Sequence, residues 1–354
     1  MQKKTKMPQT NNFRRLNREA ALELFTRGDL FALGKLANVI RWIKHPDPVV
    51  TYIVDRNINY TNICSIRCAF CAFSVDINSS KGYVLSTGEI IRKIDEAVNL
   101  GATQILMQGG VHPDLDLEYF EKLFRDIKSK FNVQIHSLSP SEISFLSKKT
   151  GISVQDVILR LKQAGLDSIP GGGAEMLVDS VRRIISPRKI NALEWLDVMR
   201  EAHLIGMKTT ATMMFGSIES PGDIVEHLLR IRDLQDETGG FTSFIPWSYQ
   251  PGNTALGGKT ATGTDYLRVL ALSRVVLDNV DNIQASWVTQ GLKVAQIALF
   301  FGANDIGNVM IEENVVAATG VKNSVTEQDL IDVVMSAGFH PAKRNTLYEI
   351  LELH

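Results

Sequence analysis

The sequence predicts an α/β protein built as one (β/α)8 barrel, with an N-terminal helical extension and C-terminal helices. Two observations predict this fold. Short β-branched or apolar runs alternate with longer amphipathic segments along the chain, which is typical of parallel strands joined by crossover helices. Eight such units follow one another, and a closed barrel needs eight. A doubly wound open sheet is the alternative, but no GxGxxG motif follows the first strand.

The elements follow in a regular order. A helical stretch over about 17–45 comes first, because its apolar residues recur at helical spacing. Helical segments then separate the strand candidates, and several of these segments end in glycine, as helix C-termini often do. We divide the chain into an N-terminal helical extension (1–48), the barrel (49–325) and a helical tail packed on the barrel (326–354). The strand candidates are 51–59, 103–108, 133–138, 167–170, 209–216, 241–247, 283–290 and 304–310.

The composition is that of a soluble globular protein. The 354 residues are 44% hydrophobic and carry a formal net charge of −1, which gives no support for a nucleic-acid or membrane-surface partner. No apolar run approaches the ~18 residues of a membrane span. The basic start, MQKKTKMPQTNNFRR, is not followed by the apolar region of a secretory signal. We therefore expect a cytoplasmic protein.

All three cysteines lie within eight positions, as Cys64-x3-Cys68-x2-Cys71, about five residues after the first strand. An odd number argues against a disulfide framework, and thiolates are the usual ligands of iron–sulfur clusters. Three ligands leave one iron of a four-iron cluster open to a substrate or cofactor. Because function gathers at the carboxyl ends of barrel strands, we place a site there. A zinc site completed by a distant His or Asp, and a cysteine loop without function, are the alternatives.

The same segment, with Phe70 before the last cysteine, resembles the signature of radical S-adenosyl-L-methionine (SAM) enzymes. This resemblance implies a [4Fe-4S] cluster held by Cys64, Cys68 and Cys71, with SAM chelating the open iron. One electron, from a donor such as flavodoxin or ferredoxin, then breaks the C5′–S bond of SAM and gives methionine and a 5′-deoxyadenosyl radical. The protein positions this radical and excludes water.

Two loops carry the rest of the expected cofactor site. The segment MQGGVHPDL (107–115) resembles the GGE-like segment of that family, so Gly109 and Gly110 would approach the amino end of SAM. Val111 stands where a glutamate is common, and a plain tight turn is the alternative. In IPGGGAEML (169–177), Glu175 would contact the ribose or methionine part of SAM. The alternative is that Glu175 only favours a helix N-terminus.

The expected substrate contacts lie near the ends of the first and third strands. They are Arg56 and Asn59 in DRNINYTN, and His136 and Ser139 in QIHSLSP. Hydrogen bonding within the barrel interior is the alternative for each of them. Trp247, Gln250 and Trp287 follow later strands and would shape an adenine or aryl pocket, unless they belong to the core.

Segments along almost the whole chain, among them VTYIVDRNINYTNIC, GLDSIPGGGAE and ASWVTQG, resemble radical SAM enzymes of the futalosine route to menaquinone. The resemblance implies dehypoxanthine futalosine as the substrate. The radical would take a hydrogen from its ribosyl moiety, the carbon radical would add to the benzoate ring, and loss of an electron and a proton would restore aromaticity. Aminofutalosine synthesis and the radical SAM half of deazaflavin synthesis share most of these motifs. A non-enzymatic iron–sulfur sensor also remains open.

Overall fold

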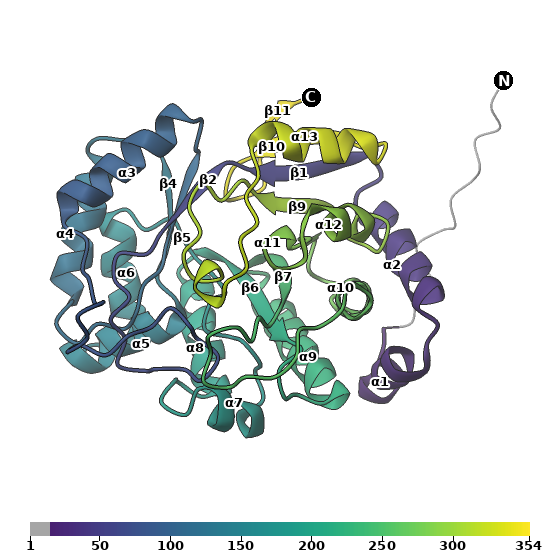
Figure 1. Cartoon of the computed structure of the whole chain (residues 1–354), viewed down its shortest axis with the longest axis horizontal. Coiled ribbons are helices and arrows are strands. Elements are labelled where there is room, and N and C mark those ends of the chain that lie inside the picture. Colours follow the sequence, from purple (N-terminus) through teal and green to yellow (C-terminus); the bar gives the residue numbers. More distant parts are fainter. Residues whose placement is uncertain (1–14) are drawn as a thin grey trace.

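The computed structural model describes residues 15–354, and in this part of the chain the predicted barrel is present (Figure 1). Each expected strand segment overlaps a strand, although 51–59 is divided into two strands and 283–290 shares only Ile283 with its strand. Residues 287–290 depart from expectation, because they form a helical turn rather than the end of a strand. Residues 1–14, with most of the basic start, lie outside the described part. The strands are β1 (Val49–Ile53), β2 (Asp55–Ile58), β3 (Gln104–Met107), β4 (Gln134–Ser137), β5 (Ser168–Ile169), β6 (Lys208–Phe215), β7 (Phe241–Ser248), β8 (Asn282–Ile283) and β9 (Asp305–Asn308).

The helices begin where the sequence offers side-chain caps. Ser86, Ser139, Asn191 and Ser220 each close a capping box at the start of a helix, and Gly151, Gly165 and Gly239 end helices in the left-handed conformation. These helices are α1 (Arg18–Arg27), α2 (Leu30–Lys44), α3 (Thr87–Asn99), α4 (Leu117–Lys128), α5 (Pro140–Thr150), α6 (Val154–Ala164), α7 (Asp179–Ile185), α8 (Ala192–Leu204), α9 (Pro221–Thr238), α10 (Gly263–Val276), α11 (Trp287–Gln290), α12 (Leu292–Ala298) and α13 (Glu327–Ser336).

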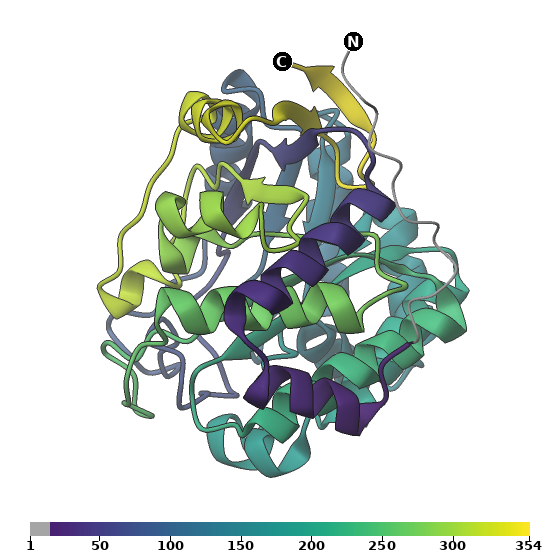
Figure 2. The ribbon, with the colours of Figure 1, turned by 90° about the vertical axis from the view of Figure 1, so that its right-hand side faces the viewer.

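The described part of the N-terminal extension, from residue 15, is helical as expected. Helix α1 packs on α9 and α2 packs on α10, so the two purple helices of Figure 2 form an additional layer on one side of the barrel. No helix within residues 15–354 is long and apolar enough to span a membrane.

Two sheets together close the barrel. Strands β2 to β8 pair in chain order, all parallel, and β1 pairs in parallel with β9. A bridge between Gln284 and Asp305 joins the end of β8 to β9. Because only Val54 separates β1 from β2, the strands form a continuous ring.

The alternation of side chains along each strand separates two environments. Ile105, Ile135 and Met213 face the helices and are fully buried, each contributing roughly 1.5–3 kcal/mol of burial free energy. The opposite faces of the same strands carry Gln104, His136 and Thr212, which line the interior. The apolar core therefore lies between strands and helices, and the interior of the barrel is left polar enough to bind a ligand.

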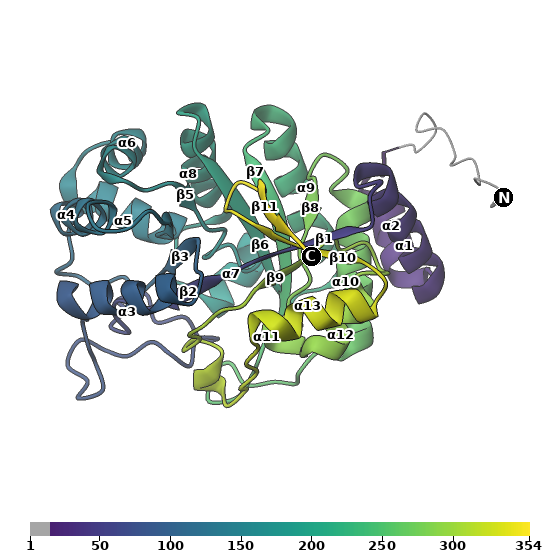
Figure 3. The same ribbon diagram turned by 90° about the horizontal axis from the view of Figure 1, so that it is seen from above.

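The C-terminal tail was expected to be helical throughout, and this prediction is wrong in part. Helix α13 is present, but it is followed by β10 (His340–Arg344) and β11 (Ile350–Leu353). Strand β10 pairs in parallel with β1, and β11 pairs antiparallel with β10. The free edge of β1, almost 300 residues earlier in the chain, supplies the hydrogen bonds that make this segment a strand. Figure 3 shows the C-terminal strands lying across one end of the barrel.

Candidate active site

A cavity of about 410 Å³ occupies the barrel interior. Cys64, Cys68 and Cys71 line it at the carboxyl ends of the strands. At the other end it is lined by Arg344, Thr346 and Tyr348 of the tail. Thr346 donates to Gln104 and Gln134, the first residues of β3 and β4. The cavity therefore runs from the cysteine loop to a floor made by the C-terminus.

The cysteine loop connects β2 to α3 and is held on several sides. The Cys64 N–H donates to the Val75 carbonyl at 3.1 Å, and the Val111 N–H lies 3.4 Å from the Cys64 sulfur. The Ala69 N–H donates to the Ile185 carbonyl at 2.8 Å. Arg67 has a φ of 52°, which turns the chain between the first two cysteines. These contacts bring all three thiols to one end of the cavity.

Gly109 and Gly110 lie beside this loop and cannot be replaced without displacing it. A Cβ on Gly110 would stand 2.1 Å from the Ile63 carbonyl oxygen and 2.8 Å from the Cβ of Cys64. A Cβ on Gly109 would stand 2.7 Å from the Tyr60 ring. Both glycines line the cavity, and because their N–H groups donate to Glu142 and to the Thr61 carbonyl, their carbonyls are the backbone groups left for a ligand next to the cysteines. Their contact with SAM stays a prediction.

Glu175 lines the cavity close to the cysteine loop and is almost fully buried. Its Oε1 accepts a hydrogen bond from Lys189 Nζ at 2.9 Å, while its buried Oε2 has no hydrogen-bond partner among residues 15–354. The Arg182 guanidinium is 3.9 Å away from Oε2, beyond hydrogen-bonding distance. An unpaired buried carboxylate oxygen facing a cavity is a group that a ligand hydroxyl or ammonium would satisfy.

Lys189 is a site residue that the sequence did not reveal. Its Nζ lies 5.4 Å from the centre of the Phe70 ring, the aromatic residue of the cysteine motif. Burial by itself lowers the pKa of Lys189, but the neighbouring Cys68 and Glu175 charges outweigh it, and the pKa is raised. The residue was missed because Lys189 lies in a basic segment, RRIISPRKI, that looks like a solvated helix end.

Glu142, which was also missed, ties several of these parts together. Its carboxylate accepts hydrogen bonds from the Tyr60 hydroxyl at 2.5 Å, the Ser139 N–H at 2.6 Å and the Gly109 N–H at 3.3 Å. Burial raises its pKa. Ser139, an expected substrate contact, lines the cavity, but its hydroxyl also caps α5 by accepting from the Glu142 N–H. The capping box signal SPSE could have indicated this role.

Arg56 does not reach the cavity, in contrast to the expectation for this residue. Its guanidinium donates to Glu312 and Glu96, both at 2.8 Å, on the helix side of β2. The reason is strand parity, because Asp55 and Asn57 point inward and the residue between them must point outward. The structure therefore does not support Arg56 as a substrate contact, and Asn57 occupies the interior position.

Asn59 and His136 do line the cavity. Asn59 donates to the Gln108 carbonyl at 3.0 Å. Burial lowers the pKa of His136 to about 3, so its ring is neutral, and its Nδ1 has no partner among the described residues. Trp247 and Trp287 also line the cavity, whereas Gln250 is turned toward Ser248 and is not part of the lining.

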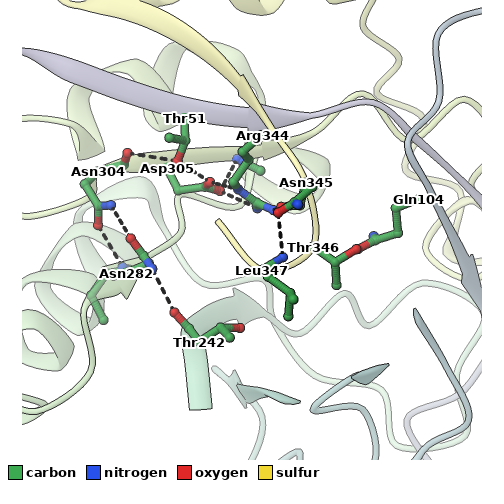
Figure 4. A network of polar contacts seen from close by, with 12 residues as sticks. Thr51, Gln104, Thr242, Asn282, Asn304, Asp305, Arg344, Asn345, Thr346 and Leu347 are labelled. Carbon is green, nitrogen blue, oxygen red and sulfur yellow. Dashed lines mark hydrogen bonds and ion pairs between the residues drawn. The ribbon is translucent and has the colours of Figure 1, made fainter. Parts of the chain in front are cut away.

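The floor of the cavity is a network of buried polar groups (Figure 4). Arg344 Nε donates to Asp305 Oδ2 at 2.5 Å and Nη2 donates to Oδ1 at 3.2 Å. Thr51 donates to the same carboxylate at 2.6 Å, and Thr346 donates to Gln104 at 2.7 Å. Long-range contacts of this kind join the tail to the amino ends of β1, β3 and β9, and the order of residues in the sequence gives no local sign of them.

The fold and this geometry define a class of protein. Residues 58–231 match the model of the radical SAM superfamily, and residues 238–354 match the CofH/MqnC C-terminal region. The chain belongs to the radical SAM superfamily. It is an enzyme of this superfamily and uses a [4Fe-4S] cluster and SAM.

Relatives within this class are similar over almost the whole chain. The chain is 44% identical, over 96% of its length and 86% of the relative's, to the cyclic dehypoxanthine futalosine synthase of Streptomyces coelicolor. It is also 44% identical to the protein of that name from Halalkalibacterium halodurans, over 96% of this chain and 92% of that protein. A third relative, 42% identical over 95% of both chains, is the 5-amino-6-(D-ribitylamino)uracil–L-tyrosine 4-hydroxyphenyl transferase of Methanothermobacter thermautotrophicus.

Solved structures support the fold. Methylornithine synthase (PylB) superposes with a TM-score of 0.73 at 16% identity, over 93% of this chain and 95% of that chain. The maturase HydG from Carboxydothermus hydrogenoformans superposes with a TM-score of 0.74 at 17% identity, over 94% of this chain and 77% of that chain. The predicted barrel is thus confirmed.

Proposed function

We propose that this enzyme converts dehypoxanthine futalosine to cyclic dehypoxanthine futalosine in menaquinone biosynthesis. The observation that carries the proposal is the 44% identity, over 96% of the chain, to two proteins named for that reaction. The cavity agrees with it, because the thiols stand at one end and aromatic and polar side chains continue to the other.

The residues at the cysteine end fit a cluster and SAM. In this proposal Cys64, Cys68 and Cys71 hold the cluster, while Phe70, Gly109, Gly110 and Glu175 surround SAM. The unpaired Oε2 of Glu175 would accept a hydrogen bond from SAM, and the carbonyls of Gly109 and Gly110, which line the cavity, would meet its amino end. When bound, the cluster and SAM would supply the radical chemistry, removal of a hydrogen atom from the ribosyl moiety of the substrate by a 5′-deoxyadenosyl radical.

The chain's own contribution is to position the substrate and exclude water. Trp247 and Trp287 offer flat apolar surfaces in the cavity, and the Trp287 indole is fixed by donating to the Asn308 carbonyl at 2.9 Å. Asn59, His136 and Ser139 supply polar contacts. Holding the aryl ring against the ribosyl carbon turns its addition into a favoured intramolecular step. The adduct would then lose one proton to water and return one electron to the oxidised cluster, which would restore the aromatic ring.

The proposal also covers the cellular location, the partners and the electron donor of the enzyme. The enzyme works in the cytoplasm, with neither nucleic acid nor membrane as a partner. A protein of the flavodoxin or ferredoxin type delivers the reducing electron.

The test is an anaerobic turnover assay. The enzyme is loaded with iron and sulfide, reduced, and mixed with SAM in the presence or absence of dehypoxanthine futalosine. We expect 5′-deoxyadenosine to rise strongly with substrate, together with a product lighter than the substrate by two hydrogens, both measured by mass spectrometry. Cys64→Ala should hold no complete cluster and give neither product. SAM cleavage at the same rate with and without dehypoxanthine futalosine would refute the proposal.

A second candidate is the transfer of a hydroxyphenyl group from tyrosine, the reaction in the name of the archaeal relative at 42% identity. The same assay separates the two candidates, with tyrosine and 5-amino-6-(D-ribitylamino)uracil replacing the first substrate. Formation of a coupled product from this pair, with none from dehypoxanthine futalosine, would favour the second candidate.

A further inference from the structure

The floor of the cavity contains buried polar groups that the fold leaves without partners. The hydroxyls of Tyr348 and Ser243 and the Nδ1 of His136 are buried, line the cavity, and make no hydrogen bond with any residue among 15–354. The Ser243 hydroxyl stands beside the Tyr348 hydroxyl and acts to lower its pKa, but the pair falls short of full hydrogen-bond geometry, so each hydroxyl keeps hydrogen-bonding capacity for a ligand. Unpaired buried polar groups are costly, so their concentration in one place indicates a polar ligand.

Arg344 adds a fixed positive group to this floor. Its guanidinium stacks on the Tyr348 ring, with 3.9 Å from Cζ to the ring centre. Three of its five N–H groups are used, two by Asp305 and one by the Asn345 carbonyl. The other two have no partner among the described residues. Arg344 is therefore held in one orientation and can still donate.

The position of Arg344 along the cavity indicates which end of a ligand it would contact. Among the side chains that line the cavity, the cationic ones are Lys189 and Arg344. Lys189 stands at the cysteine end and is paired with Glu175. Arg344 stands at the opposite end, so an anionic group of a ligand that reaches away from the cysteines would meet it there.

Two carboxylates outweigh the single positive charge of the floor at neutral pH. Asp305 pairs with Arg344. Asp55, whose pKa burial raises to about 6, accepts hydrogen bonds from Asn308, Gln104 and the Met310 N–H. A further anion would therefore depend on directed N–H and O–H donors rather than on an unpaired positive charge. The floor offers such donors in Arg344, Tyr348 and Ser243.

We propose that the floor formed by Arg344, Tyr348 and Ser243 binds the carboxylate of the substrate. This inference rests on the proposed function, whose substrate carries a benzoate group. The two hydroxyls and the remaining Arg344 N–H groups donate to the carboxylate oxygens. The aryl end of the substrate is thereby directed to the amino ends of the strands, and its ribosyl end faces SAM and the cysteines.

The test removes hydroxyl groups and leaves the fold intact. Tyr348→Phe, Ser243→Ala and the double variant lose only one or two oxygens. Tyr52→Phe is the matched control, because its hydroxyl bonds Glu327 outside the cavity. Iron content and the thermal unfolding midpoint confirm that each variant is folded and loaded. Binding of benzoate and of neutral benzamide is then measured by saturation-transfer NMR, and KM is measured for dehypoxanthine futalosine.

We expect wild type and Tyr52→Phe to bind benzoate in preference to benzamide. The double variant should lose this preference and show a KM raised about tenfold or more, since hydrogen bonds to a charged group are among the stronger ones. Unchanged benzoate binding and KM in the double variant would overturn the inference, as would a wild-type protein that does not bind benzoate.

The same measurements separate the inference from the proposed function. Benzoate binding that depends on Tyr348 and Ser243, in an enzyme that forms no cyclic product, would retain the carboxylate site and refute the reaction. Normal product formation by the double variant would retain the reaction and refute the site.

Discussion

Lys189 and Glu175 form a buried ion pair, with 2.9 Å between Nζ and Oε1, at the cysteine end of the cavity. One carboxylate oxygen is paired and the other is free. The lysine holds the carboxylate in place and balances its charge, so that the free oxygen can serve a ligand. Two of the expected outcomes below follow from this pair.

Glu175→Ala should weaken SAM binding by about tenfold or more and leave the cluster in place. The variant removes the free oxygen but none of the thiols, so the iron content and the cluster's visible absorbance should match those of wild type. The measurement is equilibrium binding of SAM to the loaded enzyme. An unchanged SAM affinity would remove Glu175 from the cofactor site.

Lys189→Met should affect both SAM binding and folding, because it leaves a buried carboxylate without its partner. Breaking a buried pair in this way costs about 3–5 kcal/mol. Lys148→Met is the control, since the Lys148–Glu194 pair is on the surface and contributes about 0–1 kcal/mol. Chemical denaturation of the two variants should differ clearly, and equal midpoints would contradict the assigned role of Lys189.

Gly110→Ala should prevent loading of the cluster. The added Cβ would stand 2.1 Å from the Ile63 carbonyl oxygen, so the backbone leading into Cys64 must move. Gly88→Ala is the matched control, because its Cβ would meet only Ser86 Oγ at 3.9 Å and alanine favours a helix. The iron content of each variant is measured after anaerobic reconstitution. A full complement of iron in Gly110→Ala would show that the contact with the Ile63 carbonyl does not limit loading of the cluster.

Asp55 should make the stability of the protein depend on pH. Burial raises its pKa from 3.8 to about 6 in the folded state, so the folded protein binds this proton more tightly than the unfolded chain does. The tighter binding of this proton stabilises the folded state fully below about pH 4, and this stabilisation is lost as the pH rises through 6. One pKa unit corresponds to about 1.4 kcal/mol, so the full loss is about 3 kcal/mol.

Asp55→Asn removes this titration while keeping the size of the side chain. Relative to the variant, wild type should lose stability between pH 5.0 and pH 7.5, as measured by chemical denaturation at both values. A constant difference between the two proteins across this range would show that the pKa of Asp55 is not raised.

Much of the fold could be predicted because its signals are local. The strand–helix alternation, the capping residues and the spacing of three cysteines are each contained in short segments. They were sufficient to predict eight segments that each overlap a strand, although 283–290 shares only Ile283 with β8, and to place Cys64, Cys68 and Cys71 at the carboxyl ends of the strands. Gly109, Gly110 and Glu175 were placed beside them for the same reason, since each lies in a loop that leaves a strand.

The errors have physical causes as well. The side on which Arg56 emerges depends on strand register, and a shift of one residue reverses it. The segment β10 forms a strand because the edge of β1 is free to pair with it, and β11 then pairs with β10, so neither strand depends on its own pattern alone. In the sequence, Lys189 resembles an ordinary basic residue and Glu142 resembles an ordinary helix-capping residue. Their roles follow from the fold, which places Glu175 next to Lys189 and Gly109 next to Glu142.

The sequence by itself determined the barrel, the cysteine cluster and the family, since these depend on periodicity and on spacing within one loop. The tertiary structure alone decided which polar side chains face the cavity and what closes its floor. Thr346 and Gln104 are 242 positions apart, yet 2.7 Å separates the hydroxyl of one from the amide oxygen of the other. Contacts across such distances depend on how the strands close into a ring, and no local pattern of residues encodes them.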